Sequence, residues 1–169
     1  MDAIGFPGLF LELWASEPST LDALGRPEAA EALMVLERFH SGSRLLEEVR
    51  LAQVDLELHS GFDAGAGAES PLVAARRVEE RSSQALLKSG EERELCSFLE
   101  PFATGHASGY YANLWARVLA ADAFDAFQEL GEDEEAVRGL GLKLRSVVLA
   151  PGGGLAGLAA FRDFLGRNP

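Results

Sequence analysis

The sequence predicts an all-α fold, a multi-helix bundle formed by a single domain over residues 1–169. Apolar residues recur every three or four positions, which is the period of an amphipathic helix rather than that of a strand. Runs of β-branched residues, which favour strands, are almost absent. A chain of 169 residues is about the size of one domain and is long enough to bury a substantial core.

The first helix is predicted to begin at Pro7, because proline suits the first helical turn. One side of this helix carries four apolar residues, Leu9, Phe10, Leu13 and Trp14. A short second helix follows, for which Ser16 or Ser19 provides the N-terminal cap and Gly25 the end.

Two longer helices and a loop are predicted next. One helix opens at Pro27 and closes at Ser41–Gly42, and the other covers 43–59 with apolar residues at helical spacing. Residues 61–70, GFDAGAGAES, predict a flexible loop that is too short to separate two domains. A helix over 71–87, opened by a proline, follows this loop.

The C-terminal half of the sequence predicts four further helical segments. A weak one covers 92–99, and the longest of the chain covers 109–130. The next, over 133–150, has an aspartate at its N-cap. A tight glycine-rich loop at 151–154 leads to the last helix, over 155–165.

Charge and composition exclude several classes of partner. With 15 Lys and Arg against 27 Asp and Glu, the net charge is −12, so we predict no nucleic-acid partner, because phosphate binding needs a basic face. The longest apolar runs are too short to span a bilayer, and the first residues lack a signal peptide's basic head and apolar run. A lone cysteine, Cys96, excludes an intrachain disulfide. We therefore expect an intracellular protein, soluble or peripheral to a complex.

No self-contained catalytic motif is visible. The histidines His40, His59 and His106 lie far apart, and none belongs to an H-E-x-x-H pair that would hold zinc on one helical face. No G-x-S-x-G elbow occurs, and the triple glycine at 152–154 lacks the lysine and hydroxyl residue of a P-loop. We therefore predict no catalytic residue, no metal ligand and no cofactor for this chain on its own.

Four segments, in order along the chain, carry a family pattern. They are FPGLFLELWASEPSTLDAL (6–24), FHSGSRLLEEVRLAQVDLELHS (39–60), ATGHASGYYANLWARVLAADAFDAF (103–127) and VLAPGGGLAGLAAFRDFLGRNP (148–169). The third is similar to G-Y-x-A-x-Y-Y-x-Y-L-W-x-x-V-x-x-x-D-x-F. On these segments the chain resembles the C-terminal part of the thimet oligopeptidase and oligopeptidase A family of zinc metallopeptidases.

The resemblance implies the C-terminal helical lobe of a zinc metalloendopeptidase. In that family the H-E-x-x-H helix precedes all four segments, so we expect the zinc-binding helix to be missing here. The third zinc ligand of the family is the glutamate of V-E-x-P, and alignment on Pro7 and Trp14 places that position at Gly5. Glycine has no donor atom, so the resemblance predicts no zinc ligand in this sequence.

The resemblance also concerns substrate binding. In the family, the first tyrosine of the glycine-rich lead-in and the last of the tyrosine cluster hold the substrate and polarise its scissile carbonyl. Those two positions are His106 and Asn113 here, whereas Tyr110 and Tyr111 keep the two between them. We predict that these four residues are a vestigial substrate-binding wall, in which the tyrosine rings now pack in the core or along a groove.

The predicted function is that of a catalytically incomplete, peptidase-derived helical domain, a structural or interaction subunit of a larger assembly. In the family fold these helices pack against the catalytic region, so we expect a protein partner over the apolar face of Leu9, Phe10, Leu13 and Trp14. Two alternatives stay open. A separate chain that bears the histidines completes a split zinc oligopeptidase, or the chain binds short peptides without cleaving them.

Overall fold

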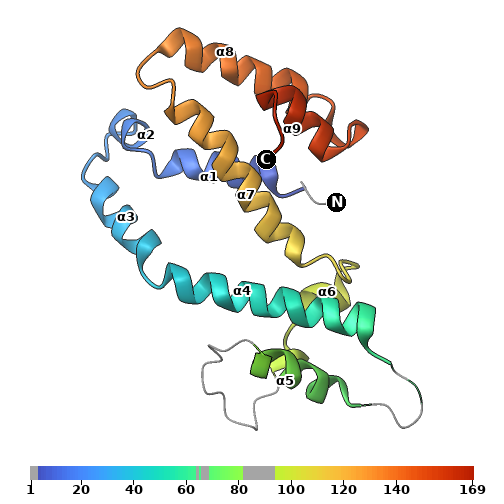
Figure 1. Ribbon diagram of the computed structural model, residues 1–169. Helices are drawn as coiled ribbons and strands as arrows, with labels where there is room; N and C mark the ends of the chain where they lie inside the picture. Colours follow the sequence, from blue (N-terminus) through green and yellow to red (C-terminus); the bar gives the residue numbers. More distant parts are fainter. Residues whose placement is uncertain (1–3, 64, 66–68, 82–93) are drawn as a thin grey trace. The chain divides into compact units, whose positions relative to one another are not determined.

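The computed structural model of the protein describes residues 4–63, 65, 69–81 and 94–169. Within these ranges every regular element is helical (Figure 1), so the predicted all-α fold is confirmed. The chain forms two compact units. Unit 1 comprises Met1–Phe39 and Trp115–Pro169, and unit 2 comprises His40–Leu114. The single domain expected from the sequence stays a prediction.

Unit 1 contains the first three helices, most of the long seventh helix and the last two helices. They are α1 (Phe6–Ala15), α2 (Pro18–Ala23), α3 (Ala29–Arg38), α7 (Tyr111–Gln128), α8 (Glu134–Leu144) and α9 (Gly157–Leu165), with a π-helical turn at Arg145–Leu149 and a 3₁₀ turn at Gly152–Gly154. The glycine-rich segment predicted as a loop at 151–154 is thus mostly a 3₁₀ turn ahead of α9.

The helix ends of unit 1 follow the predicted capping signals in part. Asp133 caps α8 as predicted, because its carboxylate accepts a hydrogen bond from a backbone N–H of the first turn at 3.0 Å. The predicted serine cap of α2 is wrong. Glu17 occupies that N-cap position, and Ser19 lies inside the helix. The Ser16 hydroxyl donates instead to the carboxylate of Glu37, at the end of α3.

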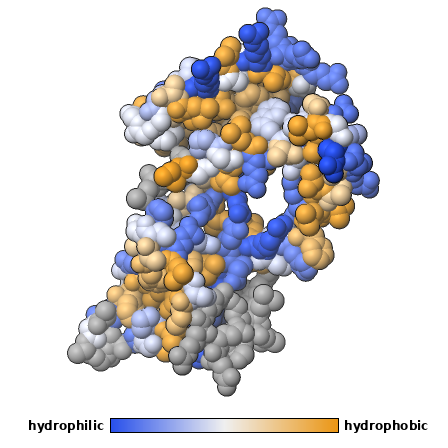
Figure 2. Space-filling model, turned by 180° about the vertical axis from the view of Figure 1, so that it is seen from behind, coloured by the Kyte–Doolittle hydropathy of each residue, from blue (hydrophilic) through white to orange (hydrophobic). Residues whose placement is uncertain are grey.

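Helix α3 differs from the other helices described in unit 1, because none of its residues is buried. Two of its residues, Val35 and Leu36, are each 63% exposed, and Phe39, at its C-cap, is 64% exposed. In the view of Figure 2, hydrophobic side chains in orange reach the surface beside hydrophilic ones in blue. Unit 1 therefore keeps large apolar side chains outside its core.

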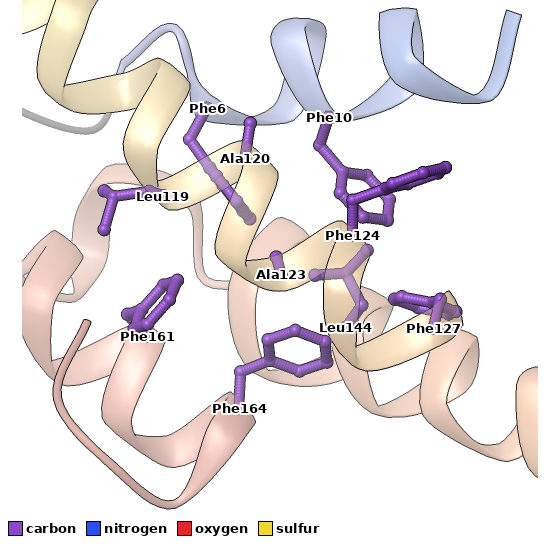
Figure 3. Packing of buried hydrophobic residues seen from close by; sticks show 10 residues of the cluster. All are labelled: Phe6, Phe10, Leu119, Ala120, Ala123, Phe124, Phe127, Leu144, Phe161 and Phe164. Atoms are coloured by element: carbon purple, nitrogen blue, oxygen red, sulfur yellow. The ribbon is translucent and has the colours of Figure 1, made fainter. Parts of the chain in front are cut away.

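The core of unit 1 consists mainly of phenylalanine rings packed against small residues of α7. Ala120 and Ala123 are 1% and 0% exposed, and their small side chains allow neighbouring helices to approach closely. Figure 3 shows rings from α1 and α9 around this part of α7. The buried cluster comprises Phe6, Phe10, Leu119, Ala120, Ala123, Phe124, Phe127, Leu144, Phe161 and Phe164. It joins the N-terminal and C-terminal segments of unit 1.

Unit 2 is built around one long helix. It contains α4 (Ser41–Leu56), α5 (Pro71–Arg81), α6 (Leu99–Ala103) and the first residues of α7, with a π-helical turn at Glu57–Gly61 and a 3₁₀ turn at Glu94–Cys96. The predicted helix end at Ser41–Gly42 is wrong. The break falls at His40, whose φ of 54° is left-handed, and Ser41 already begins α4.

Three predicted segments of unit 2 lie partly outside the described residues. The parts concerned are 64 and 66–68 of the loop expected over 61–70, 82–87 of the helix expected over 71–87, and 92–93 of the segment expected over 92–99. In the loop, Phe62, Asp63 and Gly65 are not helical, and Gly61 closes the π-helical turn. Helix α5 begins at Pro71, as predicted.

Charged side chains join α4 to its neighbours in unit 2. Arg50 is only 6% exposed, and its guanidinium lies 2.5 Å from a carboxylate oxygen of Glu47 and 2.6 Å from one of Glu79. Arg77 of α5 pairs with Glu57 at 2.6 Å. A small apolar cluster accompanies these ion pairs and comprises Val54, Ala75 and Val78, with Leu58 and Leu95 packed against it.

Candidate functional site: a glycine-containing loop at the start of α7

The predicted substrate-wall residues lie on a tight loop of unit 2 and on the first turn of α7. Two residues of the loop are left-handed, Gly105 with φ of 77° and Ser108 with φ of 55°. A Cβ atom on Gly109 would lie 3.0 Å from the carbonyl oxygen of His106, and the Gly109 N–H donates to that same oxygen at 2.8 Å. The loop therefore depends on two left-handed residues and on a glycine with little room for a side chain.

Asp55 of α4 holds this loop. Its side chain is 0% exposed, and its two carboxylate oxygens accept hydrogen bonds from the backbone N–H groups of Ser108 and Tyr110, each at 3.0 Å. His59, one turn further along the chain, places its Nδ1 atom 2.8 Å from Oδ1 of the same carboxylate. A buried charge is stable only when donors surround it, and these three groups supply them.

The ring of His59 has a defined orientation. Its Nδ1 atom also lies 2.8 Å from the backbone carbonyl oxygen of Asp55. Because both nearby atoms are acceptors, Nδ1 must carry a proton and donate. The ring also lies near Phe102, with the ring centroids 5.4 Å apart. His59 thus connects the buried carboxylate to an aromatic side chain of α6.

The two tyrosines occupy different environments. The half-buried ring of Tyr110 lies edge-on to Phe98, with the centroids 4.9 Å apart and the planes at 84°. Tyr111, the first residue of α7, is 38% exposed. Adjacent residues near a helix start point in different directions. The structure therefore packs Tyr110 against the interior of unit 2 and leaves Tyr111 at its surface.

The other two predicted wall residues are exposed polar side chains. The Nδ1 atom of His106 lies 2.9 Å from the hydroxyl oxygen of Thr104. Asn113 donates through its side-chain amide to a carboxylate oxygen of Glu100 at 3.3 Å. The loop and the first turn of α7 thus bring all four predicted residues into one stretch of unit 2, and a role in substrate binding stays a prediction.

The described residues do not fit the zinc ion that the sequence resemblance implies. Gly5 is the N-cap residue of α1 and has no donor side chain. Over the part of the chain that the structure describes, no three His, Cys, Asp or Glu side chains come together as a metal centre would require. Catalytic zinc takes three protein ligands and keeps a further position for water. We therefore assign no zinc-dependent step to these residues.

The face predicted to meet a partner lies largely inside unit 1. Phe10 is 4% exposed and belongs to the buried cluster, and Leu9 and Trp14 pack against that cluster. Leu13 is 36% exposed. The Trp14 ring lies 5.1 Å from the ring of Phe124, measured between centroids. Contacts within unit 1 therefore cover most of this face.

An apolar hollow of about 300 Å³ lies within unit 2. Its lining residues are Leu58, Phe62, Pro71, Leu95 and Phe102. Phe102 also contacts the ring of His59, so the hollow borders the side chains that hold the loop. A hollow of this size and chemistry suits an apolar side chain.

Asp55 and His59 are not among the functional residues predicted from the sequence. The signal that marks them is their separation of four positions within the segment 39–60, because residues four apart share one face of a helix. Asp55 contacts Ser108 and Tyr110 of the loop, which lie 53 and 55 positions further along the chain. Local periodicity carries no information about such a contact.

Among the described residues, no helix is long and apolar enough to cross a membrane.

Comparisons with known proteins place these features in a family. The profile described as Peptidase family M3 matches residues 1–169. An alignment of 178 residues, which covers 99% of this chain, shows 39% identity to the organellar oligopeptidase A, chloroplastic/mitochondrial, of Arabidopsis thaliana. An alignment of the same length, again covering 99% of the chain, shows 30% identity to the oligopeptidase A of Escherichia coli strain K12. A dipeptidyl carboxypeptidase of Salmonella typhimurium is 28% identical in an alignment of 169 residues that covers 89% of the chain.

The matched region is a small part of each relative. It covers 22% of the plant protein, 25% of the E. coli protein and 23% of the Salmonella protein. The chain thus spans about a quarter of the length of the curated relatives that it matches. The profile and the identities confirm the resemblance that the four ordered segments indicated, and the chain therefore belongs to peptidase family M3.

Proposed function

We propose that this chain is a helical interaction subunit of a larger peptidase-family assembly, to which it contributes scaffold rather than zinc chemistry. The observation that carries the proposal is an exposed apolar stripe on α3. Ala32, Val35, Leu36 and Phe39 follow the spacing i, i+3, i+4, i+7, which places them on one face of a helix. We call these four residues the α3 stripe. An exposed apolar face of this kind favours contact with another protein surface.

The partner surface that we propose for the α3 stripe is the remainder of a family M3 fold. This chain covers only 22% and 25% of the two oligopeptidase A relatives. The partner surface then comes from the part of the family fold that has no counterpart within residues 1–169, carried by a second polypeptide. Burial of Val35 and Leu36, each 63% exposed, would contribute about 1–2 kcal/mol per side chain.

The scaffold role, as opposed to a catalytic one, rests on the residues at the family's functional positions. Gly5 offers no donor atom where the resemblance places a zinc ligand. His106 and Asn113 stand where the resemblance places tyrosines that polarise the scissile carbonyl. The side chains that build the cores of both units are apolar by contrast. These substitutions favour a fold that persists without its own peptide-bond chemistry.

The first experiment is native mass spectrometry, with zinc analysis of the same sample, on the protein purified from its own cells without denaturation. We expect a complex heavier than the 18.1 kDa of this chain. Leu36→Lys should release the chain from the complex, because it places a charge within the α3 stripe. Leu158→Lys is the matched control, since Leu158 is 46% exposed and lies on α9, and it should leave the complex intact.

Two outcomes would count against this proposal. A wild-type chain of 18.1 kDa that travels alone would refute an interaction subunit. A complex with stoichiometric zinc, which hydrolyses peptides only when this chain is present, would replace the scaffold role by the split peptidase.

A second candidate function, peptide binding without cleavage, is favoured by the apolar hollow of about 300 Å³ in unit 2. Its volume lies at the lower end of the range for ligand pockets, and its apolar lining suits an apolar group of a peptide. Fluorescence anisotropy with a labelled short apolar peptide would test it. Saturable binding that Phe102→Ala weakens would support this function, and a flat titration with the wild-type chain would remove it.

A further inference from the structure

We propose that Asp55 is a positioning residue, which fixes the loop over 105–110 and the first turn of α7 through its buried carboxylate. This role concerns the internal order of unit 2 and requires no partner, so it stands or falls independently of the interaction function proposed above.

Both oxygens of the Asp55 carboxylate are used. Oδ1 accepts from the Ser108 N–H at 3.0 Å and lies 2.8 Å from His59 Nδ1, and Oδ2 accepts from the Tyr110 N–H at 3.0 Å. A carboxylate is an acceptor at both oxygens, whereas an asparagine amide would turn an NH₂ group toward one of these N–H donors. The arrangement therefore requires an aspartate and does not tolerate its amide.

The position of Tyr110 makes this carboxylate a cap for α7. Tyr110 directly precedes the helix, which runs from Tyr111 to Gln128. The first N–H groups of a helix have no acceptor within it, and its N-terminus carries a partial positive charge. Asp55 supplies both an acceptor and a negative charge at that end, from a different helix. It thus caps α7 from outside the helix's own segment of the chain.

The loop itself needs an external support. Ser108 has φ of 55°, a left-handed conformation that is unfavourable for a residue with a Cβ atom. Its backbone N–H is one of the two groups that Asp55 accepts. The carboxylate therefore stabilises the loop at the residue where its backbone is least favourable.

A series of aromatic contacts links the anchor formed by Asp55 and His59 to the ring of Tyr110. The His59 ring lies near Phe102, Phe102 lies edge-on to Phe98 with the centroids 6.3 Å apart, and Phe98 lies edge-on to Tyr110. This series of rings runs from one end of the hydrogen-bonded anchor to the other. The consequence is that His106 extends from a loop, and Tyr111 and Asn113 from a first helical turn, that this anchor holds in place.

The test is residue-resolved amide hydrogen exchange by NMR on the whole chain, for wild type and Asp55→Asn. We expect the exchange rates of the Ser108 and Tyr110 amides to rise about tenfold or more in Asp55→Asn. The variant lacks the charge-assisted hydrogen bonds to these amides, so local opening of the loop costs less free energy. The amides of Ala123 and Phe161, in the core of unit 1, should keep their wild-type rates. Asp63→Asn is the matched control.

Asp63 suits this purpose because it is an exposed aspartate of unit 2 that accepts a backbone N–H from Gly65 at 2.9 Å. The control removes the same charge and should leave Ser108 and Tyr110 unchanged. The proposal is overturned if Asp55→Asn leaves those two amides unchanged, or if it raises exchange uniformly across both units. A uniform rise would mean that Asp55 contributes only to general stability.

If Asp55→Asn does not fold, measurements on the wild-type chain alone still test the proposal. The Ser108 and Tyr110 amides should be protected although neither lies within a helix, and the ¹⁵N shifts of His59 should report a protonated Nδ1. Exchange of both amides at the rate of an unstructured peptide would overturn the proposal, as would a His59 ring with Nδ1 unprotonated.

Discussion

Replacement of Phe164 by alanine tests whether the aromatic core holds unit 1 together. Phe164 is 1% exposed, and its ring centroid lies 6.3 Å from that of Phe127. Truncation of a buried phenylalanine costs about 3–5 kcal/mol, because it removes buried apolar surface and leaves a cavity. A domain is stable by only about 5–15 kcal/mol in total. Phe164→Ala should therefore remove a large share of the free energy of unfolding of unit 1.

The distribution of aromatic residues provides a selective assay. Both tryptophans, Trp14 and Trp115, belong to unit 1, whereas both tyrosines belong to unit 2. Tryptophan fluorescence during urea unfolding therefore reports on unit 1. With a urea dependence of about 2 kcal/mol per molar, a loss of about 4 kcal/mol lowers the midpoint by about 2 M.

Leu158→Ala is the control, because Leu158 lies on the same helix, α9, and is 46% exposed. It should cost less than about 1 kcal/mol, or about 0.5 M in midpoint. Equal midpoint shifts for the two variants would refute the reasoning, since the effect would then reflect helix α9 as a whole rather than burial of the Phe164 ring.

Two further changes test the ion pairs and the absent zinc ligand. Arg50→Ala should lower the free energy of unfolding of unit 2 by about 3 kcal/mol, measured by urea unfolding followed by circular dichroism, because Glu47 and Glu79 lose a buried cation. The control is Arg26→Ala, which removes an ion pair whose side chains are 70% and 67% exposed and should cost less than about 1 kcal/mol. Similar losses for the two variants would contradict the role given to burial. Gly5→Glu should change stability by less than about 1 kcal/mol, because its backbone is right-handed with φ of −79°. Calorimetry should detect no zinc binding to this variant, whereas uptake of one ion per chain would show that other ligands are present.

The sequence predicted the long helices well because each has a strong apolar period and recognisable ends, whereas residues 100–103 of α6 lie outside every predicted helix. Pro71 opens α5 and Asp133 caps α8, as their local chemistry indicates. The misplaced end at Ser41–Gly42 has a physical explanation. The chain breaks at His40, a left-handed residue that is not glycine, and the glycine that suggested the break lies inside α4. A local pattern identifies glycine as a helix breaker, but tertiary context decides where the break occurs.

The location of the candidate site could be predicted from the sequence, but the residue that holds its loop could not. The resemblance singled out His106, Tyr110, Tyr111 and Asn113, and these residues do lie on one loop and the following helical turn. The anchor depends on contacts of Asp55 with Ser108 and Tyr110, which lie 53 and 55 positions further along the chain. No helical period encodes contacts over such separations. The same limit applies to Phe10, which the sequence placed on a partner-facing side and which packs in the core of unit 1 instead.

The different environments of the two tyrosines imply different roles, which single substitutions can separate. Tyr110→Ala removes a half-buried ring that lies edge-on to Phe98, and it should cost unit 2 about 2 kcal/mol. Tyr111→Ala removes a ring that is 38% exposed and should cost less than about 1 kcal/mol. Circular dichroism of unfolding measures both, and tryptophan fluorescence should show unit 1 unchanged in each variant.

If Tyr110→Ala instead proved neutral while Tyr111→Ala destabilised the chain, the assignment of Tyr110 to the interior of unit 2 would be wrong. With the expected result, a ligand-binding defect in Tyr110→Ala could not be separated from loss of the fold. Peptide binding by this loop must then be measured with Tyr111→Ala and Asn113→Ala, because their side chains are exposed and can be changed while the anchor at Asp55 stays in place.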